Sequence, residues 1–81
     1  MPRQTYPMVS IPIQTETIRL SQLLKLANVV QDGVEAKFRI ANDEVRVNGE
    51  MEIRRGRKLR NGDVVEFNGE IYEIVATNST T

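Results

Sequence analysis

The most distinctive chemistry in the sequence lies in one short run of positive charge. Residues 53–60 contain five basic side chains and no acidic one, whereas residues 61–81 contain four acidic side chains and no basic one. Cations this close together repel one another, and binding to a polyanion removes that repulsion and releases counterions. Arginine also offers a planar fork of donors that matches phosphate. The run, whose five cations are Arg54, Arg55, Arg57, Lys58 and Arg60, therefore indicates a basic patch for nucleic acid centred on the first four of them.

Charge in the rest of the chain leaves a plainer interpretation open. The chain has 11 basic and 11 acidic residues and no net charge, so only the distribution of charge points to nucleic acid. The run would be an ordinary solvated loop if nearby carboxylates balanced it. These carboxylates are Glu50, Glu52, Glu66 and Glu70.

The basic run has no aromatic residue within it. This argues against a platform that stacks single-stranded bases and favours recognition of the backbone or shape of folded RNA. DNA is the less favoured partner, although phosphate contacts alone do not distinguish the two nucleic acids.

Few other side chains could do catalytic or metal chemistry. The sequence contains no Cys and no His, so it lacks a thiolate nucleophile and the commonest metal ligand. Scattered carboxylates such as Asp32 and Asp63 follow no metal-loop spacing, and no nucleophile–base pair or glycine-rich phosphate loop accompanies them. We therefore predict a non-enzymatic protein with no metal and no cofactor.

The length of 81 residues predicts one domain over residues 1–81, with a core over about 9–75 and a flexible tail over 76–81. No apolar run approaches the roughly 18 residues that a membrane-spanning helix needs. Residues 1–8 lack the charged and then apolar plan of a signal peptide. We therefore expect a cytoplasmic protein that does not enter a membrane.

Two helices are predicted to precede the basic run. Apolar residues recur at i, i+3, i+4 and i+7 from Leu20, which predicts a helix from about residue 19 or 20 to 28–30. Residues 34–41 predict a second helix with one apolar face. Lys25 and Lys37 lie off these apolar faces, where they could extend the basic patch. Phe38 fits neither face clearly.

The remaining segments are predicted to form strands. Apolar residues alternate with polar ones around Val9–Ile13, and Pro12 indicates a sheet edge because it cannot donate a backbone hydrogen bond. Val45 and Val47 indicate a short strand that ends at the turn dipeptide Asn48-Gly49.

The clearest hairpin follows, with β-rich runs over 64–67 and 70–75 on either side of Asn68-Gly69. Residues 53–60 are predicted to be a loop or an irregular β-arm. The order of elements predicts an α+β fold in which two short helices pack on a small antiparallel sheet.

Several of these residues resemble the RNA-binding domain first seen in the fourth protein of the small ribosomal subunit, here called the S-four domain or alpha-L RNA-binding motif. The matching positions are Arg19, Leu20, Ala36, Val45, Val47, Asn48 and Gly49. The runs 33–37, 48–59 and 62–65 resemble short stand-alone bacterial members of that family. The resemblance covers about residues 18–67, but Asp43 stands where the signature has Gly, and Ser21 replaces a common acidic residue.

This resemblance implies a pair of helices and a β-arm that face structured RNA, often ribosomal RNA, and it implies no catalysis. Carried over by position, cations from the helices and arm would grip phosphates, and residues near the turn would contact RNA. The implied RNA-binding residues are Lys25, Lys37, Arg46, Asn48, Arg54, Arg55, Arg57 and Lys58.

A second hypothesis is a protein-interaction module in which the basic loop docks on an acidic partner. The acidic C-terminal third could also meet the basic loop of another copy. The sequence leaves open the oligomeric state, the RNA that is bound and the process that it serves.

Overall fold

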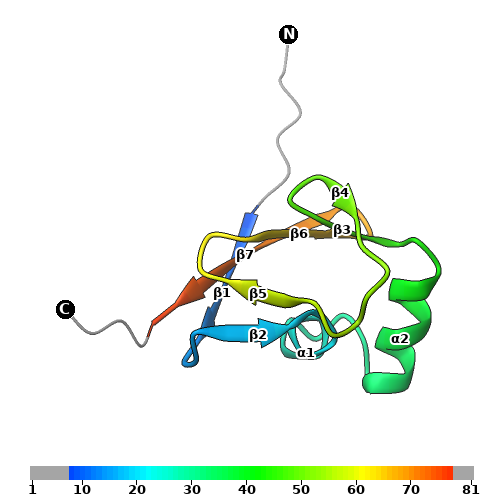
Figure 1. The fold of residues 1–81 in the computed structure, drawn as a ribbon, viewed down its shortest axis with the longest axis horizontal. Coiled ribbons are helices and arrows are strands. Elements are labelled where there is room, and N and C mark those ends of the chain that lie inside the picture. The colour runs from blue at the N-terminus through cyan, green and yellow to red at the C-terminus, as the bar shows by residue number, and fades with distance from the viewer. Residues whose placement is uncertain (1–7, 78–81) are drawn as a thin grey trace, which may run out of the picture.

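The computed structural model describes residues 8–77, which form two short helices and seven strands (Figure 1). In chain order these are β1 (Met8–Ile13), β2 (Thr17–Arg19), α1 (Leu20–Leu26), α2 (Gly33–Ala41), β3 (Val45–Val47), β4 (Glu50–Met51), β5 (Lys58–Arg60), β6 (Val64–Phe67) and β7 (Glu70–Ala76). No helix within the described range is long and apolar enough to cross a membrane.

The larger sheet has five strands in the order β1-β7-β6-β3-β4. Strand β1 lies at its edge, as Pro12 predicted. The α+β fold class is confirmed, but the sheet is mixed rather than wholly antiparallel, because β1 runs parallel to β7 with Met8 opposite Ile71. Residues 14–69 separate these two strands, so no tight turn forces them to be antiparallel.

Two hairpins within this sheet confirm the turn predictions. Asn48 and Gly49 join β3 to β4 with φ angles of 53° and 86°, and Asn68 and Gly69 join β6 to β7 with 54° and 82°. A two-residue hairpin loop of this kind needs positive φ at both positions, which Asn and Gly tolerate. The Asn-Gly dipeptides therefore set the register of both hairpins.

The helices match their predictions except at the end of α1. That helix ends at Leu26, before the predicted 28–30, and Asn28 in the following turn has a left-handed φ of 62°. Helix α2 begins where the Asp32 side chain accepts a hydrogen bond of 2.9 Å from the amide of Glu35. Asp43, which stands where the signature has Gly, takes the left-handed conformation with φ 62° beyond the end of α2.

A second, two-stranded sheet pairs β2 with β5. Part of the predicted β-arm is therefore a true strand, whereas β2 itself was not predicted because three residues are too few for a recognisable alternation. Figure 1 shows this small sheet beside α1, and α2 lies next to α1.

One apolar core joins the helices and both sheets. Its fully buried members include Leu20 and Leu24 from α1, Ile40 from α2, Leu59 from β5 and Ile74 from β7. Leu59 anchors the basic segment because its own side chain is buried in this core. Its two neighbours in β5, Lys58 and Arg60, are exposed cations, so the buried Leu59 holds them at the surface.

Residues 76 and 77 were predicted to belong to a flexible tail, but the first is part of the sheet and the second is bonded to it. Ala76 ends β7, and the amide of Thr77 donates a hydrogen bond of 2.8 Å to the carbonyl oxygen of Ile13. The rest of that tail, residues 78–81, lies outside the described residues. The single domain over 1–81 stays a prediction.

Candidate nucleic-acid interface

The backbone of the basic segment is attached to the beginning of α1. The amide of Leu20 donates a hydrogen bond of 2.8 Å to the carbonyl oxygen of Arg57, and the amide of Ser21 donates one of 3.1 Å to that of Arg55. The first amides of a helix have no partner within the helix. Here the carbonyl groups of residues 55 and 57 satisfy two of them. We call residues 54–60 the basic arm, and its position relative to the helices is set by these bonds.

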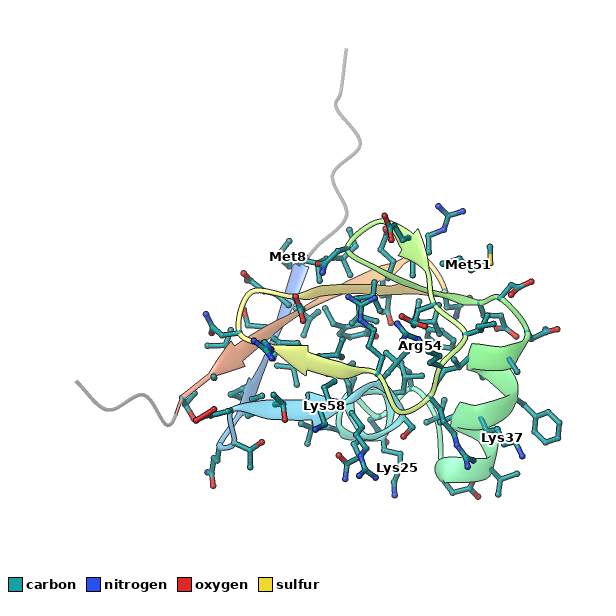
Figure 2. The ribbon with its side chains drawn as sticks, in the orientation of Figure 1. Met8, Lys25, Lys37, Met51, Arg54 and Lys58 are labelled. Carbon is teal, nitrogen blue, oxygen red and sulfur yellow. The ribbon has the colours of Figure 1, made fainter. Side chains whose placement is uncertain are left out.

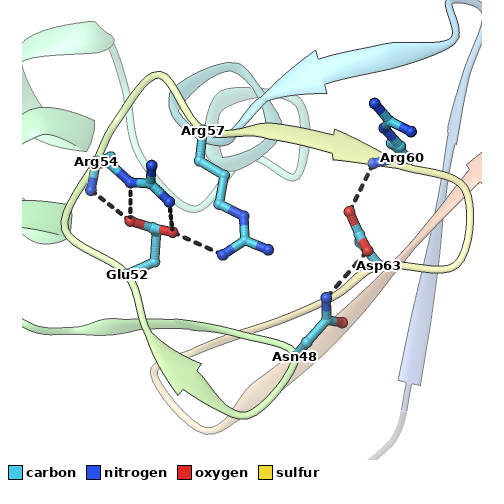
Figure 3. Close-up of polar contacts among 6 residues, drawn as sticks. All are labelled: Asn48, Glu52, Arg54, Arg57, Arg60 and Asp63. Carbon is cyan, nitrogen blue, oxygen red and sulfur yellow. Dashed lines mark hydrogen bonds and ion pairs between the residues drawn. The ribbon is translucent and has the colours of Figure 1, made fainter.

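Glu52, just before the arm, holds two of its arginines. The Glu52 side chain is buried and accepts hydrogen bonds from the amide, Nε and Nη2 of Arg54 at 3.0, 3.0 and 3.2 Å. It also accepts a bond of 2.8 Å from Nη1 of Arg57 (Figure 3). The side-chain hydrogen bonds from Arg54 and then from Arg57 lower the pKa of Glu52 to about 2, although burial opposes them. Glu52 is therefore ionised near neutral pH.

This contact revises the expected charge of the arm. Of the four carboxylates that could have balanced it, only Glu52 forms an ion pair with the arm among the described residues. Arg54 remains 73% exposed despite this pairing. A guanidinium group has five donors, so Arg54 and Arg57 each keep donors that are free for a ligand.

Arg55 and Lys58 are exposed and form no ion pair with any residue in the range 8–77. Lys58 lies directly opposite Arg19 in the β2–β5 pairing, and Arg19 is also exposed. Like charges at directly opposite positions of two strands are destabilising. An anion that binds between them would relieve this repulsion.

A groove of about 620 Å³ lies between the beginning of α1, the helix α2 and the basic arm. Three cations line it, each from a different segment: Arg19, Lys37 and Arg55. None of its lining residues is acidic. The remaining lining residues are Ser21, Gly33, Val34, Phe38 and Gly56. The tertiary structure thus gathers positive charge that is scattered along the sequence.

Of the predicted RNA-binding residues, Lys37 and Arg55 line the groove, whereas the others lie elsewhere on the arm or on neighbouring surfaces. Figure 2 shows Lys37, Arg54 and Lys58 on α2 and the arm, with Lys25 on α1. Lys25 lines a separate hollow with Thr17 and Leu26, so it does not border the groove.

Arg46 projects from the exposed face of β3, opposite Glu66 of β6, and it does not line the groove either.

Asn48 has a clear role inside the protein. Its Nδ2 donates to Oδ1 of Asp63 at 3.1 Å, and its Oδ1 accepts from the amide of Val64 at 2.9 Å. Asp63 in turn accepts a bond of 2.8 Å from the amide of Arg60 (Figure 3). These contacts join the β3–β4 turn to the end of the basic arm, while a contact of Asn48 with RNA stays a prediction.

Only Lys37 and Arg55 of the groove residues were in the predicted set; of the others, Arg19 and Phe38 carry the chemistry that matters here. Arg19 was noted only as part of the Arg-Leu signature, although its charge and its position before a helix were visible. Phe38 was ambiguous by periodicity, and it is 69% exposed in the structure. Only the packing of α2 against α1 shows that both belong to one groove.

Exposed cations that no carboxylate pairs with in the range 8–77 make this region suited to an anionic ligand. Residues 11–75 match the family model described as the S4 domain. The chain belongs to the S4 domain family. This confirms the S-four resemblance, and the matched range includes the basic arm and both helices.

Similar proteins fit this S4 domain in sequence and in structure. RlbA of Bacillus subtilis, named as a probable ribosome maturation protein, is 56% identical over 59 residues, which cover 73% of this chain and 83% of RlbA. YbcJ of Escherichia coli is 37% identical over 59 residues, covering 73% of this chain and 84% of YbcJ.

The solution structure of YbcJ, described as having an alpha-L motif involved in RNA binding, aligns with a TM-score of 0.67. Its sequence identity is 31%, and the alignment covers 94% of this chain and 98% of YbcJ. The ribosomal protein S4e of Thermoplasma acidophilum aligns with a TM-score of 0.56 and 27% identity, over 73% of this chain and 31% of that one. The S4 fold is therefore shared with both.

Proposed function

We propose that this S4 domain binds folded RNA, with ribosomal RNA as its class of target, and that it catalyses no reaction. The observation that carries the proposal is the groove lined by Arg19, Lys37 and Arg55 without any acidic side chain. The names of its relatives support it, because RlbA is named for ribosome maturation and the YbcJ structure for RNA binding. The cytoplasmic location stays a prediction.

The proposed contacts differ in kind. Arg55, Lys58 and Lys37 bind phosphates directly, since no carboxylate in the range 8–77 pairs with them. Arg54 and Arg57 bind phosphates with the donors that Glu52 leaves free. Lys25, Arg46 and Asn48 complete the proposed set from the neighbouring surfaces.

The structure decides which variant tests this proposal best. Replacing Arg54 or Arg57 would remove a partner of the buried Glu52, so a loss of binding could reflect a damaged fold. The double variant Arg55→Ala and Lys58→Ala removes two exposed cations and leaves Glu52 paired. Arg39→Ala is the control, because Arg39 is a basic residue of α2 whose side chain is already paired with Glu35 and Glu44.

The experiment titrates labelled ribosomal RNA and duplex DNA of matched length with each protein at two salt concentrations. The parent should prefer RNA, and its affinity should fall as salt rises. The double variant should bind more weakly, and its salt slope should be smaller by about 1 for each phosphate that it no longer neutralises. The Arg39→Ala control should bind like the parent.

Failure of the parent to bind RNA at low salt would overturn the proposal. An acidic polypeptide that bound the parent and not the double variant would then favour the protein-docking hypothesis. Tighter binding to DNA than to RNA would also contradict the proposal.

A further inference from the structure

Phe38 is a large aromatic side chain on the outer surface of α2, with 69% of its surface exposed. The opposite face of the helix buries Ala36 and Ile40 in the core. A single exposed apolar residue is common on protein surfaces and needs no functional explanation. What distinguishes Phe38 is its place in the groove that also contains Arg19, Lys37 and Arg55.

The two sides of Phe38 differ in charge. On one side is the groove with its three cations, none of which forms an ion pair within residues 8–77. On the other side is a hollow lined by Arg39 and Glu44, where the Arg39 guanidinium is 3.0 Å from the Glu44 carboxylate. An anionic group near the ring would therefore lie on the side of Arg55.

An exposed aromatic ring and adjacent unpaired cations match the two parts of a nucleotide. The base has a π-face that stacks on an aromatic ring, and the phosphate binds to Arg or Lys. A base can stack in this way only when it is not held inside a duplex.

We propose that this groove receives one unpaired nucleotide of a folded RNA, with its base stacked on Phe38 and its phosphate bound by Arg55 and Lys37. This inference rests on the proposed function and adds the class of RNA, namely a stem with a bulged or unpaired base. The basic arm lacks an aromatic residue of its own, and α2 supplies one from a distant part of the chain.

The test uses two labelled RNA hairpins that differ only by one unpaired adenosine in the stem. A fluorescent adenine analogue at the unpaired position reports stacking directly. The variants are Phe38→Leu, which keeps an apolar side chain but removes the aromatic face, and Phe38→Trp, which keeps a face for stacking. Both should fold, because Phe38 is exposed and outside the core.

The parent should bind the bulged hairpin more tightly than the fully paired one. Phe38→Leu should lose roughly 5- to 150-fold in affinity for the bulged hairpin, the range expected for one base–aromatic stack. It should bind the paired hairpin as the parent does. Phe38→Trp should keep the preference, and the fluorescence of the analogue should be quenched by the parent and Phe38→Trp only.

Two outcomes separate this inference from the function on which it rests. In the first outcome, Phe38→Leu binds each hairpin as tightly as the parent does, while the double variant Arg55→Ala and Lys58→Ala binds more weakly. The RNA-binding function then stands and the stacking site is wrong. If the parent binds ribosomal RNA but neither hairpin, the stacking site alone is wrong; if it binds neither hairpin nor ribosomal RNA, both proposals are overturned.

Discussion

Nη1 of Arg57 donates a hydrogen bond of 2.8 Å to Oε1 of Glu52, and the carbonyl oxygen of the same Arg57 accepts one of 2.8 Å from the amide of Leu20. One residue of the basic arm is thus attached both to a buried carboxylate and to the beginning of α1. The conformation of the arm therefore depends on Glu52, which is itself unable to bind a phosphate.

Glu52→Gln should destabilise the protein by about 1–3 kcal/mol, because it weakens charge-assisted hydrogen bonds to Arg54 and Arg57. Affinity for RNA should fall as well, since the arm loses its fixed conformation. Urea unfolding and RNA titration measure the two effects. Glu66→Gln removes the same charge from an exposed position of β6, and its stability should stay within about 0.5 kcal/mol of the parent. Equal stability of the Glu52 and Glu66 variants would refute this role.

The stability of the fold should fall in acid partly because of Glu52. Its pKa is about 2 in the folded protein and 4.5 in its ordinary state. Between these values the unfolded chain binds a proton that the folded one does not, so the stabilisation present above about pH 4.5 is lost as the pH falls towards 2. Urea midpoints measured across this range should fall less steeply for Glu52→Gln than for the parent. Parallel profiles would contradict the assignment.

Arg19→Gln should weaken RNA binding without weakening the fold. The charge of Arg19 lies opposite that of Lys58, so its removal should leave stability unchanged or raise it by up to about 0.5 kcal/mol at low salt. The backbone amide of Arg19, which donates to Gln22 at 3.3 Å, is retained.

For stability, the matched comparison is Arg46→Gln, since Arg46 lies opposite the acidic Glu66. That variant should be slightly less stable than the parent. If Arg19→Gln instead lowered stability by more than Arg46→Gln, repulsion between Arg19 and Lys58 would not be significant.

Asp43 has a positive φ of 62°, which an L-residue adopts at a cost. Asp43→Gly should therefore change stability by no more than about 1 kcal/mol, because relief of this strain offsets the added flexibility of the unfolded chain. Asp43→Ala should be less stable than both the parent and Asp43→Gly, since Ala tolerates this conformation poorly. Thermal unfolding of the three proteins provides the ranking. An Ala variant as stable as the Gly variant would show that the turn relaxes.

Local signals predicted much of the fold. The Asn-Gly dipeptides predicted one hairpin at Asn68-Gly69 and a turn at Asn48-Gly49, and the spacing of Ala36 and Ile40 predicted the buried face of α2. These features depend on residues that are neighbours in the chain, so patterns of two or about 3.6 residues reveal them. The S-four resemblance, carried by residues such as Asn48 and Gly49, is confirmed by family membership.

Long-range contacts account for the features that were not predicted. The direction of β1 follows from its pairing with β7, more than 60 residues away, as Met8 lies opposite Ile71. Strand β2 exists because Ile18 pairs with Leu59, which is fully buried. Neither contact leaves a periodic signal within its own segment.

The primary structure alone was sufficient to indicate the basic arm and the S-four class of fold, because charge density and local turn chemistry are properties of adjacent residues. It could not show that Glu52 neutralises part of the arm, or that Arg19 and Phe38 share a groove with Arg55. Those relationships arise only when the core brings α1, α2 and the arm together, since a carboxylate or a ring acts on the groups that surround it in space.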